Sequence, residues 1–156
     1  MIDQLKSEPL FVMRLNVAYN QTQPIGAVAG GERAIFPVVG GTFEGPRLRG
    51  RVLPHGADWV IWRSDGAMVI DVRTALETDD GALISMQYVG LACGTTPESS
   101  ERFRRREVLP YEDIYVRTTP RFETADPRYE WLNRVIAVAN GARTPDGPMY
   151  HVFEIG

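Results

Sequence analysis

The stretch ADWVIWRSDGAMVIDVRTALETDDGALISMQYVGLA, residues 57–92, decides the fold. Runs rich in Val, Ile, Leu and Met are separated by Ser64-Asp65-Gly66 and by Asp79-Asp80-Gly81. Asp-Gly between two β-rich runs is a strong hairpin signal, because the tight turn needs residues that accept positive φ. The segment therefore predicts consecutive antiparallel strands at 57–63, 67–78 and 82–92.

The rest of the chain repeats this rhythm of short apolar runs and turns. Further strands are predicted at 8–19, 34–43, 47–53, 111–123, 134–139 and 148–155. Loops are predicted around Pro24 to Gly31 and around Gly141 to Gly147. A polar helical stretch at 97–107 starts with Pro97, and a short helix runs from Asp126 through Leu132 as a plug for one end. The pattern favours an all-β fold, an antiparallel up-and-down barrel or else a sandwich, with about nine or ten strands and one or two short helices.

Length and composition set limits on the class of protein. The 156 residues fit one domain, 1–156, and the net charge of −3 with a scattered basic content predicts no nucleic-acid partner. The basic cluster at residues 102–106 is interspersed with Glu101 and Glu107, and we interpret it as a solvated helical turn. One cysteine, Cys93, excludes an internal disulfide, and no segment resembles a signal peptide or a spanning helix. We therefore expect a cytoplasmic protein with no membrane partner.

Several predicted strands have one apolar face and one face that mixes charged and aromatic residues, called the mixed face below. In 67–78, Met68, Ile70 and Val72 alternate with Asp71 and Arg73. In 111–119, one face carries Tyr115 and Arg117. Such Asp–Arg and Tyr–Arg neighbours can satisfy one another where water is scarce, as in the lining of a cavity. They can equally form weak ion pairs on an outer face, so the direction of the Asp71–Arg73 face stays open.

Several longer segments resemble one known family. They are GGTFEGP (40–46), GRVLPHGADW (50–59), Asp65-Gly66, Asp71-Val-Arg73, Asp80-Gly81, YVRTTP (115–120), Phe122-Glu-Thr124 and YEWLN (129–133). On these segments the chain is similar to the domain of unknown function numbered 3237, or uncharacterised protein family 0311, from about residue 8 to 155. His55 is a departure, because that family often has glycine there.

The resemblance implies a lipocalin-like barrel with a central cavity and no established activity. Some relatives are associated with the handling of aromatic or unsaturated carbonyl compounds, and isomerase or cyclase roles are suggested for them. This implication favours mixed faces that point inward. His55 would then place an imidazole at a site entrance, or it would simply shape a turn.

The motifs exclude most familiar site chemistries. The sequence has no Cys-x-x-Cys, no His-x-x-x-His, no nucleotide fingerprint and no serine elbow, and its two histidines lie far apart. We predict no metal and no cofactor. Carboxylates beside aromatic or arginine residues remain as proton-transfer groups, because burial in an apolar barrel raises a carboxyl pKa.

These considerations select a set of candidate site residues. The expected catalytic residues are Asp71 or Asp58 as base, with Arg73 and Arg117 as partners of a developing oxyanion. The expected ligand contacts are Tyr115, Tyr88, Trp59, His55, Glu123 and Asn16. One hypothesis is a cofactor-independent isomerase, cyclase or lyase acting on an aromatic or unsaturated carbonyl compound. The other is a non-catalytic lipocalin-like protein that binds a small apolar ligand, and either is compatible with a homodimer built on exposed strand faces.

Overall fold

Within residues 2–156, which the computed structural model describes, ten strands form one antiparallel sheet. The strands are β1 (Ser7–Val17), β2 (Gln23–Val28), β3 (Gly31–Glu44), β4 (Arg49–Val52), β5 (Gly56–Trp62), β6 (Met68–Thr78), β7 (Leu83–Gly94), β8 (Ile114–Glu123), β9 (Ala137–Thr144) and β10 (Gly147–Ile155). One α-helix, α1 (Pro97–Arg104), and three 3-10 segments, η1 (Tyr19–Gln21), η2 (Tyr111–Asp113) and η3 (Pro127–Arg134), connect them.

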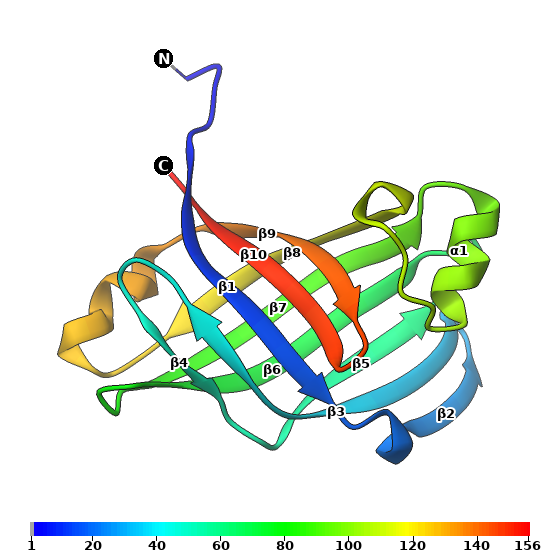
Figure 1. The fold of residues 1–156 in the computed structure, drawn as a ribbon, viewed down its shortest axis with the longest axis horizontal. Coiled ribbons are helices and arrows are strands. Elements are labelled where there is room, and N and C mark those ends of the chain that lie inside the picture. Colours follow the sequence, from blue (N-terminus) through cyan, green and yellow to red (C-terminus); the bar gives the residue numbers. More distant parts are fainter. Residues whose placement is uncertain (1) are drawn as a thin grey trace.

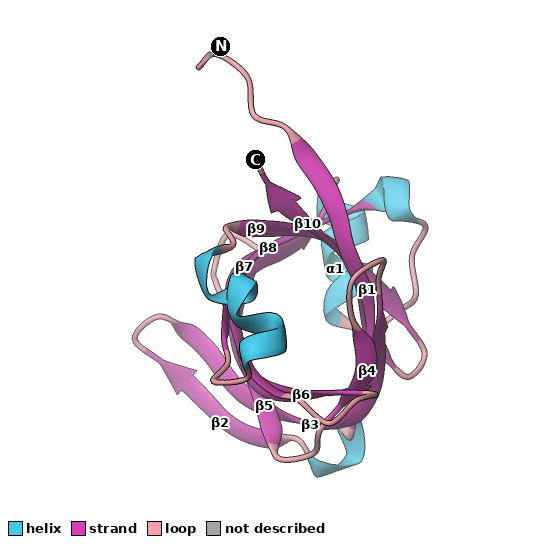
Figure 2. Cartoon of the chain, turned by 90° about the vertical axis from the view of Figure 1, so that its left-hand side faces the viewer, coloured by secondary structure: helices cyan, strands magenta, loops and turns pink. Residues whose placement is uncertain are grey.

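The sheet closes on itself because β1 pairs with strands on both of its sides. β1 is hydrogen-bonded to β10 along one edge and to the second half of β3 along the other. Seen end-on, the strands therefore make a complete ring (Figure 2). β4 and β5 together fill the place between β3 and β6, while β2 pairs with the first half of β3. The predicted antiparallel barrel is confirmed.

The two quoted hairpins form as their turn residues require. Gly66 and Gly81 adopt φ values of 87° and 91°, a region that costs glycine little. The Asp65 carboxylate also accepts a hydrogen bond from the Ala67 N–H at 3.1 Å. These turns fix the registers of β5–β6 and β6–β7, so that Asp58 lies opposite Val72, and Val72 lies opposite Tyr88.

The barrel interior takes the apolar face of each strand. In β6 the side chains of Met68, Ile70, Val72 and Leu76 are buried, whereas Asp71 and Arg73 on the alternate face are exposed. The expectation that the Asp71–Arg73 face points inward is therefore wrong. The physical reason is that a closed barrel buries one face of every strand, and apolar side chains gain most from leaving water.

The two barrel ends are built differently (Figure 1). At one end η3 lies across the opening, with Leu132 only 1% exposed, as the predicted hydrophobic plug requires. At the other end lies α1, whose first turn is held by a capping box between Thr96 and Ser99, with Pro97 inside the first turn. No helix within residues 2–156 has the length and apolar character needed to cross a bilayer.

Several parts of the strand prediction differ from the structure; for example, residues 111–113, expected in a strand, form η2, and β9 begins at Ala137 rather than at residue 134. Residues 23–28, expected to be loop, form the outer strand β2, which has a bulge between Pro24 and Gly26 where it pairs with β3. Strand β9 continues to Thr144, beyond the predicted end at residue 139, because it pairs with β10 along its full length through a tight turn at Pro145-Asp146. Pairing with a neighbouring strand overrides weak local β propensity in β2 and at the end of β9.

Candidate functional site

A cavity of about 320 Å³ occupies the end of the barrel that carries α1. Its walls are largely apolar, from inward-facing residues such as Leu15, Val38, Val60 and Ile70. The exposed side chains of Glu32 and Arg104 belong to the same lining and mark its mouth. The cavity has the size of a site for a small organic ligand. Its polar groups are few, so each can be assigned a place.

Asp58 is the carboxylate of this cavity. Strand alternation turns Asp58, Val60 and Trp62 inward, while Trp59 and its neighbours on the other face point out. One carboxylate oxygen accepts the backbone N–H of Asp71 at 3.0 Å. Burial raises the pKa of Asp58 from 3.8 to about 7, and the hydrogen bond from Asp71 offsets only part of this rise. The group therefore exchanges a proton readily near neutral pH.

Two buried tyrosines line the same cavity. Tyr88 of β7 and Tyr150 of β10 are 2% and 3% exposed, and their rings meet edge to face with centroids 5.2 Å apart. Burial, reinforced by the negative charge of nearby Asp58, raises the pKa of each phenol. Both stay neutral and can donate a hydrogen bond at physiological pH. The Tyr88 hydroxyl has no hydrogen-bond partner among the described residues, which is uncommon for a buried polar group.

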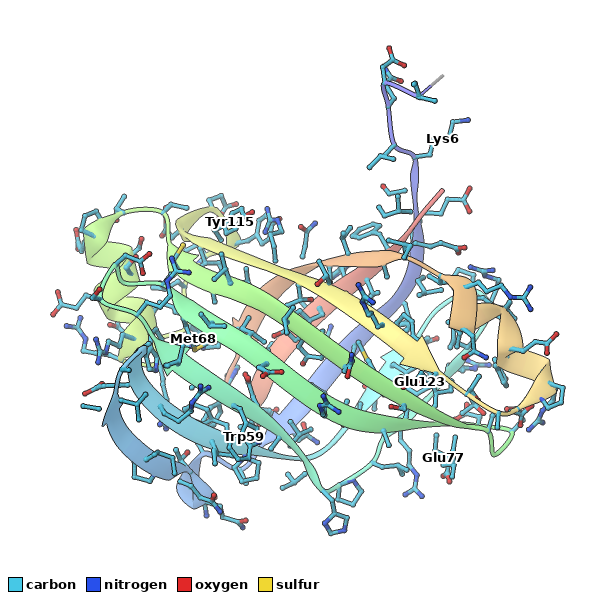
Figure 3. The ribbon with its side chains drawn as sticks, turned by 180° about the vertical axis from the view of Figure 1, so that it is seen from behind. Lys6, Trp59, Met68, Glu77, Tyr115 and Glu123 are labelled. Carbon is cyan, nitrogen blue, oxygen red and sulfur yellow. The ribbon has the colours of Figure 1, made fainter. Side chains whose placement is uncertain are left out.

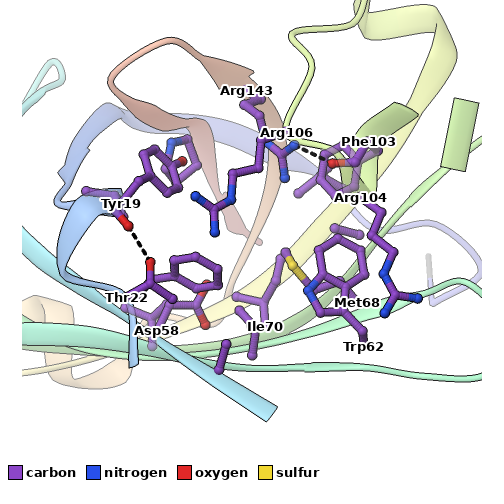
Figure 4. A pocket seen from close by; sticks show the side chains of 18 of the residues that line it. Tyr19, Thr22, Asp58, Trp62, Met68, Ile70, Phe103, Arg104, Arg106 and Arg143 are labelled. Carbon is purple, nitrogen blue, oxygen red and sulfur yellow. Dashed lines mark hydrogen bonds between the residues drawn. The ribbon is translucent and has the colours of Figure 1, made fainter. Parts of the chain in front are cut away.

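Two arginines enter the cavity from the side opposite Asp58 (Figure 4). Arg143 of β9 donates a hydrogen bond to the Phe103 carbonyl oxygen at 2.6 Å, and its guanidinium lies 3.7 Å from the centroid of the Phe103 ring. Arg106, just after α1, lies over the rings of Tyr19 and Phe36, 5.1 Å from each centroid. Burial lowers the pKa of Arg143.

Tyr19 lies beneath the Arg106 guanidinium and also lines the cavity. It lies in η1, packs edge to face on Phe36 with centroids 5.8 Å apart, and its carbonyl oxygen accepts the Thr22 hydroxyl at 2.7 Å. Burial raises the pKa of Tyr19, while the positive charges of Arg143 and Arg106 act in the opposite direction. Tyr19 is therefore a third neutral phenol in contact with the cavity.

Of the ten residues that the sequence selected, the structure places Asp58 and Tyr88 in the cavity lining. The other eight lie outside it. Asp71 and Arg73 lie on the outer face of β6, Tyr115, Arg117 and Glu123 on the outer face of β8, Trp59 on that of β5, Asn16 on that of β1, and His55 in the turn before β5. Figure 3 shows Trp59, Tyr115 and Glu123 on the outside of the barrel. An inward role for these eight residues is therefore wrong.

Four cavity residues were missed by the sequence prediction. Arg143 fell in a predicted loop, and Arg106 in the basic cluster taken as solvated. The solvated interpretation fits Arg102 and Arg105, which pair with Glu107 and Glu101. Arg106 is exposed as well, but it also belongs to the cavity lining. Tyr19 and Tyr150 lie within the predicted strands 8–19 and 148–155 and follow the alternation of their inward apolar faces, so that alternation already placed both on the inward side.

Among residues 2–156, no three His, Cys, Asp or Glu side chains gather as a metal ion would require. The polar side chains of the cavity are instead the Asp58 carboxylate, the phenols of Tyr19, Tyr88 and Tyr150, and the guanidiniums of Arg143 and Arg106, with Thr22, Glu32, Arg33 and Arg104 also in the lining. A carbonyl or carboxylate is the natural complement of the phenols and guanidiniums. This set can move a proton through Asp58 and can stabilise negative charge on oxygen through the phenols and guanidiniums.

Fold and cavity together define an antiparallel β-barrel protein whose interior pocket carries a carboxyl group of near-neutral pKa. A family model described as "Protein of unknown function (DUF3237)" matches residues 5–155, and the chain belongs to that family. A UPF0311 protein of Rhodopseudomonas palustris is 34% identical over 148 residues, which cover 95% of this chain and 96% of that protein.

Solved structures agree with the fold. A β-barrel-like protein from Acinetobacter baumannii superimposes with a TM-score of 0.85 at 36% identity, covering 98% of this chain and 97% of that one. A structure described as an enzyme from Penicillium herquei has a TM-score of 0.72 at 20% identity, with 97% of this chain and 95% of that one covered. At this identity the second likeness shows the fold alone.

Proposed function

We propose that this protein is a cofactor-independent isomerase, cyclase or lyase that moves a proton on a small aromatic or unsaturated carbonyl compound. The observation that carries the proposal is Asp58, a carboxyl group inside a largely apolar cavity with a pKa raised to about 7. A general base works best when its pKa lies near the working pH, because it is then both available and strong enough. An ordinary surface aspartate meets only the first of these conditions.

The phenols supply the second group that the reaction needs, a hydrogen-bond donor to the developing enolate oxygen. The Asp58 carboxylate takes a proton from the carbon next to the substrate carbonyl, and the C–H electron pair becomes part of an enolate. The enolate oxygen accepts a hydrogen bond from a neutral phenol, for which Tyr88 is suited because its buried hydroxyl has no partner among the described residues. Protonated Asp58 then returns the proton to a different carbon of the conjugated system, which completes an isomerisation with no net gain or loss of protons.

Proton transfer can be tested without knowing the natural substrate. We expect the protein to accelerate deuterium incorporation from D₂O into small α,β- and β,γ-unsaturated ketones, followed by NMR. Asp58→Asn should lower this rate at least 100-fold, the usual contribution of a positioned base. Asp71→Asn is the matched control, because Asp71 lies on the outer face and its backbone N–H remains available to residue 58. An Asp58→Asn protein as active as the wild type would show that Asp58 is not the base.

A non-catalytic binding protein is the second candidate. It is favoured by the outward direction of Asp71 and Arg73 and by the apolar side chains of Met68, Ile70 and Val72 in the cavity wall. It predicts that Asp58→Asn leaves ligand affinity unchanged and that the wild type shows no deuterium exchange above the buffer rate. The same NMR experiment therefore separates the two functions.

A further inference from the structure

We infer that Arg106 and Arg143 form a subsite for the carboxylate of the ligand, so that the cavity takes a small aromatic or unsaturated acid. This inference rests on the proposed function only in placing the ligand in the same cavity. The name anion subsite is used below for these two guanidiniums and the aromatic rings of Tyr19, Phe36 and Phe103 on which they lie.

The first argument is unbalanced charge. Neither Arg106 nor Arg143 forms a salt bridge with any residue from 2 to 156, although their neighbours Arg102, Arg104 and Arg105 all do. Arg143 is only partly accessible to solvent, whereas Arg106 is exposed, so the desolvation argument concerns Arg143 and Arg106 adds the second like charge. A guanidinium removed from water without a counter-charge is unfavourable, and a second guanidinium nearby adds repulsion. A carboxylate placed between the two would remove both penalties.

The second argument is that the Arg143 guanidinium is held in place before any ligand binds, with Arg106 lying over the rings of Tyr19 and Phe36 beside it. Arg143 is fixed by its hydrogen bond to the Phe103 carbonyl oxygen and by stacking on the Phe103 ring. That bond uses one of five N–H donors, which leaves donors free for a planar anion. Arginine in such a fork matches a carboxylate with two parallel hydrogen bonds. Preorganisation of this kind lowers the entropy lost on binding.

The third argument is the backbone of Arg106. It follows the last residues of α1 in the left-handed conformation, with φ of 64°, at the position where helices usually place glycine. A side chain at this position strains the backbone, and such strain is concentrated at functional sites. The side chain that this arrangement holds lies over Tyr19 and Phe36 in the cavity lining.

The remaining lining explains the choice of an aromatic or unsaturated acid. Tyr19, Phe36 and Phe103 present rings beside the guanidiniums, and the walls beyond are aliphatic and aromatic, with Trp62, Tyr88 and Tyr150 among them. Asp58 lies across the cavity from the arginines and forms no salt bridge with them. The ligand would thus place its carboxylate at the mouth and its conjugated carbon skeleton toward Asp58.

The test compares an acid with its neutral isostere. Trans-cinnamate and trans-cinnamamide differ little except in charge, and their binding is followed through the fluorescence of Trp62, which lines the cavity. We expect the wild type to bind cinnamate at least tenfold more tightly than cinnamamide. Arg106→Gly and Arg143→Met should each weaken cinnamate binding at least tenfold and leave cinnamamide binding within twofold. Arg106→Gly also removes the backbone strain, so its loss of binding is not a loss of folding.

Two arginine variants serve as controls. Arg105→Ala removes an adjacent charge that is already paired with glutamates, and Arg117→Met removes an arginine on the outside of the barrel that forms no salt bridge within residues 2–156. Both should keep the preference for cinnamate. Equal binding of acid and amide by the wild type, binding of neither at millimolar concentration, or a preference that survives in both Arg106→Gly and Arg143→Met would overturn the anion subsite. Because binding is measured here and deuterium exchange in the earlier experiment, failure of one proposal is distinct from failure of the other.

Discussion

At the scale of single residues, Asp58 shows how position changes the chemistry of a side chain. Its neighbour in space, Asp71, is of the same type and directly precedes Val72, the residue opposite Asp58 on the partner strand, yet it is exposed on the outer face. Burial raises the pKa of Asp58, because it disfavours the charged form of this carboxyl group. The sequence offered both residues as candidates, and nothing in their local composition ranked one above the other.

This pKa makes a prediction about stability. A carboxyl group with a pKa raised on folding stabilises the folded state in its protonated form. Its contribution is complete below pH 4 and is lost as pH rises through about 7. The rise from 3.8 to about 7 corresponds to roughly 4 kcal/mol of linked free energy. We expect Asp58→Asn to equal the wild type near pH 4 and to be more stable by a few kcal/mol at pH 8.5.

Urea unfolding at pH 4, 6, 7 and 8.5 measures this difference. The amide introduced by Asp58→Asn keeps an oxygen that accepts the Asp71 N–H, so the comparison isolates the charge. Asp71→Asn should keep most of the wild-type pH dependence, because burial is the largest cause of the raised Asp58 pKa and the Asp71 charge adds only a smaller part. A difference between Asp58→Asn and the wild type that does not vary with pH would contradict the raised pKa.

At the scale of elements, the turn between β4 and β5 holds a non-glycine residue at positive φ, and this conformation affects the stability of the fold. His55 is exposed there with φ of 78°, which explains why a family that shares this turn would favour glycine. The alternative of an imidazole at the site entrance is not supported, because His55 does not line the cavity. We expect His55→Gly to raise the free energy of unfolding by about 0.5–1 kcal/mol, because relief of the left-handed strain exceeds the added entropy of the unfolded chain.

The same exchange in a strand should have the opposite effect. His151 lies in β10, where the backbone is extended and glycine brings no relief. We expect His151→Gly to lower the free energy of unfolding by about 0.5–1 kcal/mol. Chemical denaturation of the two variants side by side measures both signs, and a loss of stability in His55→Gly would contradict this account of the turn.

At the scale of the whole molecule, the two ends of the barrel differ in role. The end closed by η3 contributes to stability, and the end beside α1 holds the cavity. Leu132 of η3 is 1% exposed in the core beside the plugged end, far in the fold from the anion subsite beside α1. We expect Leu132→Ala to lower the free energy of unfolding by about 2–4 kcal/mol. Leu83→Ala, at a position that is 58% exposed, should change it by less than about 0.5 kcal/mol.

Ligand binding should be insensitive to both changes. Below the unfolding transition, the cinnamate affinity of Leu132→Ala should remain within twofold of the wild type. A large loss of affinity in the folded variant would show that the plug and the cavity are coupled, against the separation of the two ends.

The sequence by itself determined the antiparallel all-β fold, most strand positions, α1 and the plug, because these depend on local signals: Asp-Gly turns, alternation of apolar residues and helix caps. It also offered Asp58 and Tyr88 for the site. Only the tertiary structure decided which face of each strand turned inward, because the choice depends on how all the strands together fill one interior. It also brought Arg143 from β9 and Arg106 from the end of α1 to the same cavity. Closure of the barrel joins these distant parts of the chain, and no local pattern records that closure.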